Sequence, residues 1–351
     1  MLYNKSMESE KTPRARFKEI LETTVIRNYD NQETKQAKIK NFCKQVQELK
    51  PKKLFRYRIF DENTFDALKK NLITSSKPKM FNDPFDSLLY VDKEEILREV
   101  KNPQNRLKFQ HWLELNPILT NSLTKNQKKQ MNSLLSESSS KYALYMRLFS
   151  PKLEKIIDNS IRDCIHYIKN HQNIVCFSEI QTSPTMWAYY ADSHKGFVIE
   201  YDFKNYNTPC TDCSERCKYQ HYELLFPVIY SDERFNAKDF VASFLLQQIF
   251  VNNPIEVFIP QDDELALYKT LLYKSNDWSH EKEWRIISQC DTFPQIIQKP
   301  IAIYLGVNMS QENRNKLIDF AEKNNITTFE MYIDNTSRQY QINYRKIKKE
   351  I

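Results

Sequence analysis

Apolar residues recur along the chain with two spacings, and the mixture predicts a protein built from both strands and helices. Alternating or continuous apolar runs, typical of strands, occupy residues 54–59, 72–76, 174–178, 197–201, 225–230 and 283–288. Apolar positions three or four residues apart, typical of amphipathic helices, occupy residues 16–26, 33–49, 263–273 and 311–324. Towards the C-terminus, IAIYLG and ITTFEMYI predict strands on either side of the last of these helices, and a final strand is expected around residues 339–344.

These elements divide the chain into three regions. Residues 1–53 predict an N-terminal helical extension that serves as a cap or as an oligomer contact. Residues 92–171 are helical in pattern and predict a helical insertion. Residues 54–91 and 172–351 together predict a mixed core, so we expect an α+β fold.

The stretch around the middle of the chain, residues 173–202, predicts a strand, a short helix and a second strand. Ser183 is placed to cap the helix, and Pro184 suits its first turn. We expect Gly196 to end the helix, because glycine commonly follows the last helical turn.

Aromatic rings are concentrated on this short helix. Trp187, Tyr190 and His194 fall on one face at helical spacing, and Tyr189 flanks them. The rings either pack in the core, as aromatic residues at this spacing usually do, or hold a ligand beside the sheet. His194 either interacts with the helix dipole or orients a substrate and transfers protons near neutral pH.

Composition adds a sizeable core and a mildly basic surface. The chain has 351 residues, 40% of them hydrophobic, and a net charge of +7 that would suit an anionic partner such as a nucleotide or RNA. The 45 acidic and 52 basic residues are interspersed, however, which is equally typical of a lysine-rich soluble surface. No apolar run is long enough to span a bilayer and the N-terminus lacks a signal-peptide core, so we expect no membrane contact and a cytoplasmic location.

The chain contains only two glycines. Glycine-rich phosphate loops of the Walker or dinucleotide-binding type are therefore excluded. Any nucleotide must be held in another way.

Three of the seven cysteines and a histidine are clustered in CTDCSERC and the residues after it. Cys210, Cys213, Cys217 and His221 have donors and spacings that could form a closed tetrahedral zinc site with a structural role. The alternative is a solvated loop without a metal, since a second CxxC pair is absent. The remaining cysteines are expected to be reduced thiols: Cys43, Cys164, Cys176 and Cys290.

Two polar clusters precede the helical insertion. Arg56 and Arg58 point the same way from the strand LFRYRIF, so they form either a solvent-facing edge or an anion clamp. In FNDPFD, Asn82 and Asp83 can hydrogen-bond to their own backbone beside Pro84, which predicts a tight turn, or they can contact a ligand.

A third polar cluster lies in HEKEWRIIS. Glu281 and Glu283 are two residues apart, so both carboxylates share a face if the strand begins early. Glu283 and Arg285 would also share that face, and a plain ion pair between them is the alternative to a chemical role.

These blocks carry a resemblance. The order LFRYRIF, FNDPFD, CFSE, MWAYYADSHKGFVIEYD and EKEWRII resembles a bacterial family of unknown function, over residues 54–344 apart from the insertion. More remotely, the arrangement is similar to the ADP-ribosyltransferase fold with its split β-sheet core, in particular to the branch of toxins that modify DNA and RNA. The sequence departs from that pattern in having RYR without the usual histidine and no Ser-Thr-Ser strand. The resemblance implies three groups of site residues: Arg56 or Arg58, then Trp187, Tyr189 or Tyr190, then Glu281 or Glu283.

The resemblance implies an enzyme that consumes NAD, either transferring ADP-ribose to RNA, DNA or protein, or hydrolysing NAD as a glycohydrolase. It also implies a toxin or an antiphage defence effector. In such a site Glu283 would stabilise the positive charge that develops on the ribose, Tyr190 or Trp187 would stack on the nicotinamide, and Arg58 would bind the pyrophosphate.

Two other classes of function remain open. A metal-dependent nuclease would use the FNDPFD aspartates with Glu200, Asp202 and Glu283 to hold Mg²⁺. A binding module would grip a nucleotide or single-stranded nucleic acid by charge and stacking without turnover. The decisive observation is whether Arg58, Tyr190 and Glu283 meet in one cleft.

Overall fold

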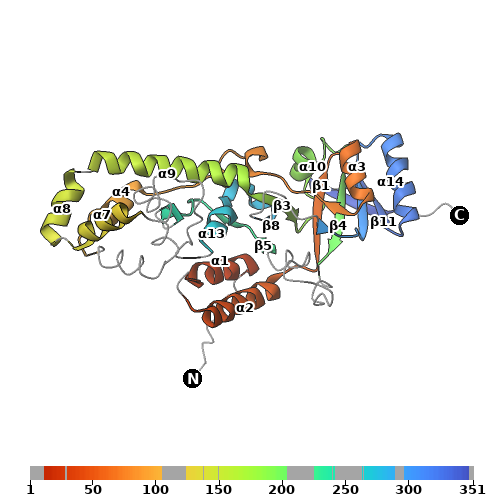
Figure 1. The fold of residues 1–351 in the computed structure, drawn as a ribbon. Helices are drawn as coiled ribbons and strands as arrows, with labels where there is room; N and C mark the ends of the chain where they lie inside the picture. The colour runs from red at the N-terminus through yellow and green to blue at the C-terminus, as the bar shows by residue number, and fades with distance from the viewer. Residues whose placement is uncertain are drawn as a thin grey trace, which may run out of the picture.

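The computed structural model describes residues 12–27, 30–104, 124–136, 138–148, 150–203, 225–238, 240–241, 263, 265–288 and 296–347. The protein is mixed α/β, and its centre is an eight-stranded, mostly antiparallel sheet with the order β12-β11-β10-β4-β1-β3-β8-β5 (Figure 1). The parallel pair is β10 and β11. The strands are β1 (Lys53–Arg58), β3 (Asn173–Ser178), β4 (Phe197–Asp202), β5 (Leu225–Pro227), β8 (Glu283–Ser288), β10 (Ala302–Leu305), β11 (Thr327–Ile333) and β12 (Ile342–Lys346).

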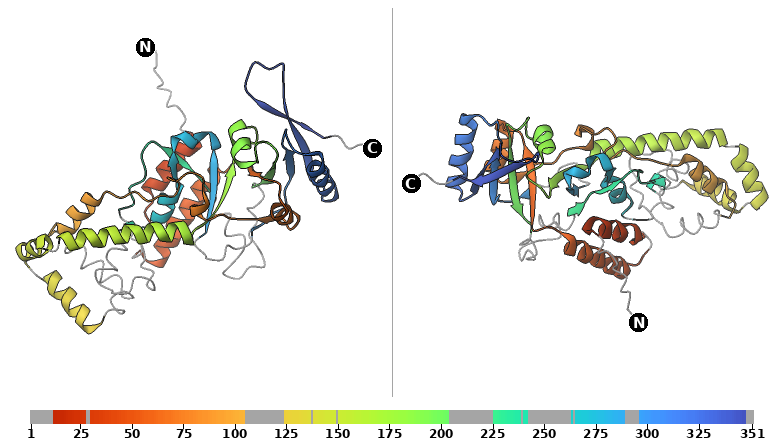
Figure 2. Two further views of the ribbon diagram at one scale, coloured as in Figure 1. Left: turned by 90° about the horizontal axis from the view of Figure 1, so that it is seen from above. Right: turned by 180° about the vertical axis from the view of Figure 1, so that it is seen from behind.

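Helices surround this sheet and extend the molecule on one side. The helices are α1 (Pro13–Thr23), α2 (Gln32–Leu49), α3 (Glu62–Lys69), α4 (Lys93–Lys101), α7 (Lys125–Ser136), α8 (Ser139–Leu148), α9 (Ser150–His171), α10 (Pro184–Tyr190), α13 (Ala266–Leu272) and α14 (Gln311–Lys323). In both views of Figure 2, α4, α7, α8 and the outer part of α9 lie at one end, whereas α14, β11 and β12 lie at the other. In the described parts of the chain, no helix is both long and apolar enough to cross a membrane.

Short elements complete the core. The described residues also form two 3-10 turns, η1 (Pro78–Met80) and η3 (Asn276–Glu281), and two small sheets separate from the large one. The small sheets pair β2 (Leu72–Ile73) with β9 (Ile296–Ile297), and β6 (Ile229–Ser231) with β7 (Tyr273–Ser275).

Strand β1 lies inside the large sheet, and its two neighbours hold it very differently. It pairs with β4 along its whole length, from Lys53 to Arg58, but it pairs with β3 at one position, Phe55 opposite Ser178. Beyond this position β1 and β3 diverge, so the sheet splits at its centre. Arg56 and Arg58 therefore do not form the solvent-facing edge that was one reading of LFRYRIF.

The alternation along β1 divides the core between the two faces of the sheet. Leu54 packs in the larger hydrophobic cluster, whereas Phe55 and Tyr57 pack in a smaller cluster with Trp187 and Tyr304. Burial of apolar surface stabilises the folded state by roughly 25 cal/mol per Å² removed from water. Shifting β1 by one residue would turn these side chains to the opposite faces, so the alternation fixes which side chains pack in which cluster.

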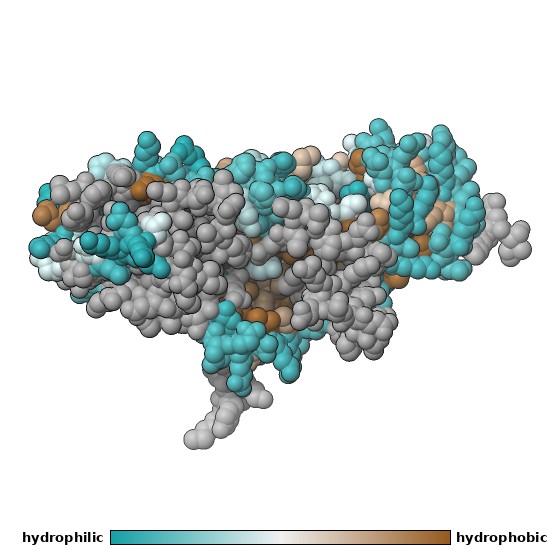
Figure 3. Space-filling model, in the orientation of Figure 1, coloured by the Kyte–Doolittle hydropathy of each residue, from teal (hydrophilic) through white to brown (hydrophobic). Residues whose placement is uncertain are grey.

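The N-terminal helices belong to the larger cluster. The Phe17 ring of α1 and the Phe42 ring of α2 lie 6.0 Å and 5.8 Å from the ring of Phe226 on β5. Their outer faces, and that of α14, are hydrophilic in Figure 3, as expected for amphipathic helices.

The start of α10 is as the sequence predicts, but its end is not. The Ser183 hydroxyl accepts a hydrogen bond from the Met186 amide at 3.3 Å, with Pro184 in the first turn. The helix ends at Tyr190, and the next residues include a left-handed run in which Asp192, Ser193 and His194 have φ of 46°, 51° and 69°. His194 is therefore on a turn rather than on the helix face where the spacing placed it.

Both glycines lie where two backbones approach closely. A Cβ atom at Gly196 would lie 2.2 Å from the carbonyl oxygen of Arg58, and one at Gly306 would lie 2.1 Å from the carbonyl oxygen of His194. Neither glycine has a positive φ. The close approach of the Arg58 carbonyl at the end of β1, and not a left-handed helix stop, is what requires Gly196.

We predict that Gly196→Ala lowers the free energy of unfolding by about 1–3 kcal/mol, because the new methyl group must push the Arg58 carbonyl away. Urea unfolding followed by circular dichroism measures the change. Lys195→Ala, at the exposed neighbouring position, is the control and should leave the midpoint almost unchanged. An unaltered midpoint for Gly196→Ala would contradict the close approach of Gly196 to the end of β1.

Candidate functional site

A cavity of about 360 Å³ occupies the split between β1 and β3. This volume is at the lower end of the roughly 300–1,000 Å³ found for small-molecule sites. Its lining includes four cationic side chains and three carboxylates, so the cavity is highly charged for its size. The lining residues are Phe55, Arg56, Tyr57, Arg58, Ser76, Met80, Phe81, Asn82, Asp86, Ile174, Cys176, Phe177, Ser178, Met186, Tyr189, Tyr190, Lys274, Glu281, Glu283 and Arg285.

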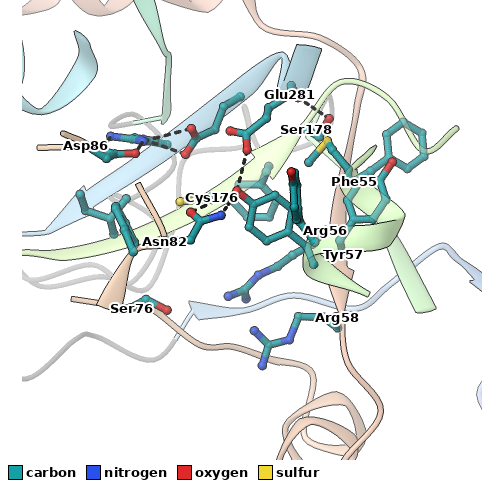
Figure 4. A pocket seen from close by; sticks show the side chains of 18 of the residues that line it. Phe55, Arg56, Tyr57, Arg58, Ser76, Asn82, Asp86, Cys176, Ser178 and Glu281 are labelled. Carbon is teal, nitrogen blue, oxygen red and sulfur yellow. Dashed lines mark hydrogen bonds and ion pairs between the residues drawn. The ribbon is translucent and has the colours of Figure 1, made fainter. Parts of the chain in front are cut away.

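One side of the cavity carries two arginines without carboxylate partners. Arg56 donates to the carbonyl oxygen of Thr74, and Arg58 Nη2 donates to the Thr64 hydroxyl at 3.2 Å. Within the described residues neither arginine forms an ion pair, and in Figure 4 no dashed line joins either one to another drawn side chain. Both guanidinium groups thus retain N–H donors for an anion.

Burial makes these two charges costly. Arg56 is 8% exposed, and burial, followed by the charge of Arg58, lowers the pKa of Arg56 to about 10. Burial also lowers the pKa of Arg58. Because burying an unpaired cation costs free energy, an anion placed between the two guanidinium groups would be bound favourably.

The other side of the cavity is a buried network of ion pairs centred on Arg285. Its guanidinium binds Asp86 through Nη1–Oδ1 at 2.9 Å and Nη2–Oδ2 at 2.5 Å, and Glu283 through Nε–Oε1 at 2.8 Å. Nη1 also donates to the Leu271 carbonyl at 2.7 Å, and the Phe81 ring lies 5.5 Å from the guanidinium carbon. Arg285 is fully buried, and these contacts use its fork of donors.

Lys274 lies among the three carboxylates of the same network. Its ammonium nitrogen is 2.5 Å from Glu281 Oε2, 3.1 Å from Glu283 Oε2 and 3.5 Å from Asp86 Oδ2. Burial alone would lower the pKa of Lys274, but the charges of Glu283 and Asp86 outweigh burial and raise it. The cation is therefore a fixed part of the site.

Glu281 connects this network to the cavity mouth. Tyr190 donates its hydroxyl proton to Glu281 Oε1 at 2.6 Å and accepts a hydrogen bond from Asn82 Nδ2 at 3.2 Å. Burial, followed by the negative charge of Glu283, raises the pKa of Glu281 above its ordinary value of 4.5.

The pKa values of the two glutamates are therefore shifted in opposite directions. For Glu283, burial would raise the pKa, but the charges of Arg285 and Lys274 outweigh it and lower the pKa. One carboxyl is suited to proton transfer and the other to a permanent negative charge, a division seen where enzymes use paired carboxyl groups.

The two carboxylates reach the cavity by a different route from the one expected. Glu281 ends η3, and Glu283 begins β8, so the strand does not start early. Between them Lys282 has a left-handed backbone, with φ 45° and ψ 52°. This turn, and not the alternation of a strand, directs both carboxylates into the cavity.

The structure brings most of the expected site residues together. Arg56, Arg58, Asn82, Tyr189, Tyr190, Glu281 and Glu283 all line the cavity. Figure 4 shows Arg56 and Arg58 on one side and Asn82 and Glu281 on the other. Arg58, Tyr190 and Glu283, whose meeting the sequence left open, thus line one cavity, and their chemical roles stay predictions.

Three expected residues lie outside the lining. Trp187 is fully buried and donates to the Gln181 carbonyl at 2.7 Å, and the His194 ring stacks on it at 6.3 Å. Burial lowers the pKa of His194. Asp83 is buried and accepts a hydrogen bond from the Phe85 amide at 2.9 Å, as expected for a tight turn.

For three residues of the site, the sequence offers little or no indication that they would line the cavity. Asp86 was expected only as one of the FNDPFD aspartates, Arg285 only as an ion-pair partner, and Lys274 not at all. A lysine in the polar run before Glu281 looks like any surface lysine. It is nevertheless buried, on β7 beside β6, with its ammonium group among three carboxylates.

The proposed metal ligands divide into two sets. Cys210, Cys213, Cys217 and His221 lie outside the described residues, as does Cys290. Glu200, a candidate of the nuclease hypothesis, lies on β4 outside the cavity and accepts a hydrogen bond from the Tyr304 hydroxyl at 2.5 Å.

Comparison with known families gives a match over part of the chain. Residues 186–286 match the profile of a family described as "Protein of unknown function (DUF2971)". These residues form a DUF2971 domain. No curated protein and no solved structure matches the chain.

The DUF2971 domain covers one side of the site. It begins in α10 and ends in β8, and it therefore includes Tyr190, Lys274, Glu281, Glu283 and Arg285. The strand with the two arginines and the FNDPFD turn precede it in the chain. The cavity therefore lies between the DUF2971 domain and the segments before it.

We predict that Asp86→Ala lowers the free energy of unfolding by about 3–5 kcal/mol, because it removes two of the contacts that compensate the buried Arg285 charge. Urea unfolding measures the effect. Asp66→Ala, which removes an exposed ion pair with Lys69, is the matched control and should leave the unfolding midpoint almost unchanged. Equal effects of the two substitutions would contradict a tightly coupled network beside the DUF2971 domain.

Proposed function

We propose that the cavity binds NAD and that the protein cleaves the bond between nicotinamide and ribose, transferring ADP-ribose to an acceptor or to water. The observation that supports this proposal is the charge arrangement of the cavity. Two arginines that have no carboxylate partner in the described part of the chain face a tyrosine and a carboxyl of raised pKa across the split in the sheet. The split itself agrees with an ADP-ribosyltransferase-like core.

The arginines suit the pyrophosphate of the dinucleotide. Arg56 and Arg58 are two residues apart on a strand, so their Cα atoms are about 7 Å apart on one face. A guanidinium donates two parallel hydrogen bonds to phosphate oxygens without a glycine-rich loop. This mode of binding agrees with a chain that has two glycines, both used in backbone packing.

The ring of Tyr190 lies beside Glu281 and is suited to hold the flat nicotinamide. When the bond to ribose breaks, its electron pair moves to the nicotinamide nitrogen, which becomes neutral, and positive charge develops on the ribose. Water or the acceptor then attacks C1′ of the ribose and loses a proton. The bond broken is C1′–N, and the bond formed is C1′–O or C1′–N of the acceptor.

The two carboxyl groups divide this work. Glu281, whose pKa is raised, takes the proton from the attacking group, since a carboxylate with a higher pKa is the stronger base. Glu283 stays ionised and supplies negative charge near the developing cation, although Arg285 and Lys274 neutralise part of it.

Lys274 favours this reading over a metal-dependent nuclease. A divalent ion would need the open oxygens of several carboxylates. The Lys274 ammonium already lies within 3.5 Å of Asp86, Glu281 and Glu283, so the centre of the carboxylate cluster holds a protein cation.

We predict that the purified protein releases nicotinamide from labelled NAD and that Glu281→Gln lowers the rate by about 100-fold or more, because the substitution removes the proton acceptor and keeps the shape. The wild-type rate should fall as the pH drops through a pKa above 4.5, since protonated Glu281 cannot accept a proton. Glu281→Gln should lose this acid limb. Absence of nicotinamide release with water, RNA, DNA and protein acceptors would refute the proposed reaction.

We also predict that Arg58→Met weakens NAD binding by about 10- to 100-fold, which corresponds to the loss of a charge-assisted contact worth about 1.5–3 kcal/mol. Calorimetric titration with NAD and with pyrophosphate measures the affinity, and both ligands should lose binding together. Arg338→Met, at an exposed arginine near β12, controls for the loss of net charge. A similar loss in both variants would show that the effect is general electrostatics and not a site.

A further inference from the structure

The N-terminal helix reaches the back of the candidate site through one side chain. Arg14, in the first turn of α1, donates through Nη1 to the carbonyl oxygens of Glu283 at 2.8 Å and Val228 at 2.9 Å. Its Nη2 binds Glu179 Oε1 at 2.6 Å. All three acceptors lie at strand ends beside the cavity, although Arg14 is more than 160 residues from each of them in the sequence.

Two of these acceptors, Glu179 and Glu283, are themselves held by neighbouring residues. Glu179 accepts a second hydrogen bond from Trp284 Nε1 at 2.7 Å, and its own amide donates to the Lys282 carbonyl at 3.2 Å. The amide of Glu283 donates to the Tyr230 hydroxyl at 2.8 Å, and the Tyr230 ring lies 5.4 Å from the Arg14 guanidinium carbon. Glu283 is thus held through both backbone groups while its carboxylate faces the cavity.

The backbone between the two carboxylates is in an unfavourable conformation. Lys282 adopts the left-handed region, which costs a residue with a side chain roughly 1–2 kcal/mol relative to its preferred states. Such a turn persists when its surroundings hold it. Glu179 holds the turn through the Lys282 carbonyl, and Ser178 donates to the Glu281 carbonyl at 2.6 Å. On the Glu283 side the contacts come from Tyr230, from the Val228 amide and from Arg14, which supplies the side-chain donor to the Glu283 carbonyl.

We propose that Arg14 is a positioning residue that holds the Glu281-Lys282-Glu283 turn, and with it the two carboxylates, in the arrangement needed for turnover. The turnover part of this inference rests on the proposed NAD reaction, whereas the structural part does not. The N-terminal helical extension is then a component of the site and not a separable cap.

The alternative role for Arg14 is only to attach α1 to the core, and the structure argues against it. The Phe17 ring and the Leu21 side chain are fully buried and attach the helix to the core without Arg14. Arg14 is partly exposed, at 20% for its side chain, and its polar contacts go to the strand ends next to the site. Its removal should therefore disturb the turn more than the attachment of the helix.

The test compares Arg14→Ala with Arg16→Ala, an exposed arginine on the same helix. Hydrogen exchange of the peptide that covers residues 279–284 should rise about tenfold or more in Arg14→Ala and stay at the wild-type rate in Arg16→Ala. Exchange in β10 and β11 should not change in either variant. Nicotinamide release should fall about 10- to 100-fold in Arg14→Ala, through kcat, while pyrophosphate affinity stays within about twofold because Arg56 and Arg58 are untouched.

A second substitution separates positioning from fastening. Glycine adopts the left-handed region without the penalty of a side chain, so Lys282→Gly in the Arg14→Ala background should restore a large part of the exchange protection and of kcat. Loss of α1 attachment would not be repaired at that distant residue. If Arg14→Ala does not fold, Arg14→Lys, which keeps the ion pair with Glu179 but not the forked contacts, is compared with Arg16→Lys.

Exchange that rises evenly over the whole chain, or a glycine at position 282 that restores nothing, would overturn the inference. Failure of this inference can be distinguished from failure of the proposed NAD reaction. A wild-type protein without nicotinamide release refutes the NAD reaction, but its exchange at residues 279–284 still decides whether Arg14 holds the turn.

Discussion

A lysine ammonium held among three carboxylates is the interaction on which this structure depends. At an effective dielectric constant near 20, each contact at about 4 Å is worth roughly 4 kcal/mol, whereas leaving one of these ions buried without its partners costs several kcal/mol. The network around Lys274 and Arg285 is therefore stable only when it is complete. Because Asp86 comes from a part of the chain far from Lys274 and Glu283, completing the network joins the FNDPFD turn to β7 and the start of β8.

The split between β1 and β3 opens a cavity between this network and two arginines. On its own the network would be a structural cluster with a small negative excess. The divergence of the two strands brings it face to face with Arg56 and Arg58, which have no carboxylate partner among the described residues. The ligand that we propose, which carries phosphate at one end and develops positive charge at the other, would suit both walls of the cavity.

Much of the fold could be predicted from local patterns. The strand at residues 283–288 has the predicted bounds, α14 ends one residue before the expected position, and Ser183 caps α10 as its residue type suggests. Alternation also placed Arg56 and Arg58 on one face. These features depend on residues that are close in sequence, where periodicity and capping carry the information.

The remaining features depend on contacts between distant segments. Asp86 joins Lys274 and Arg285 from far away in the sequence, and Arg14 reaches Glu283 across 269 positions, so neither contact could be recognised from neighbouring residues in the chain. The left-handed turns at His194 and Lys282 were missed for a related reason. Residues other than glycine adopt that conformation when tertiary contacts hold them, and no local pattern announces it.

The boundaries of the DUF2971 segment have a consequence for the protein as a folding unit. The segment contributes β4, β5 and β8, but β4 pairs with β1 and β10, and β8 pairs with β3, all outside residues 186–286. Cut out alone, those residues would expose rows of unsatisfied amide and carbonyl groups, the feature that promotes aggregation. The stretch that matches the family therefore depends on strands outside it for its pairing, and the unit that folds as one piece is larger than the matched residues.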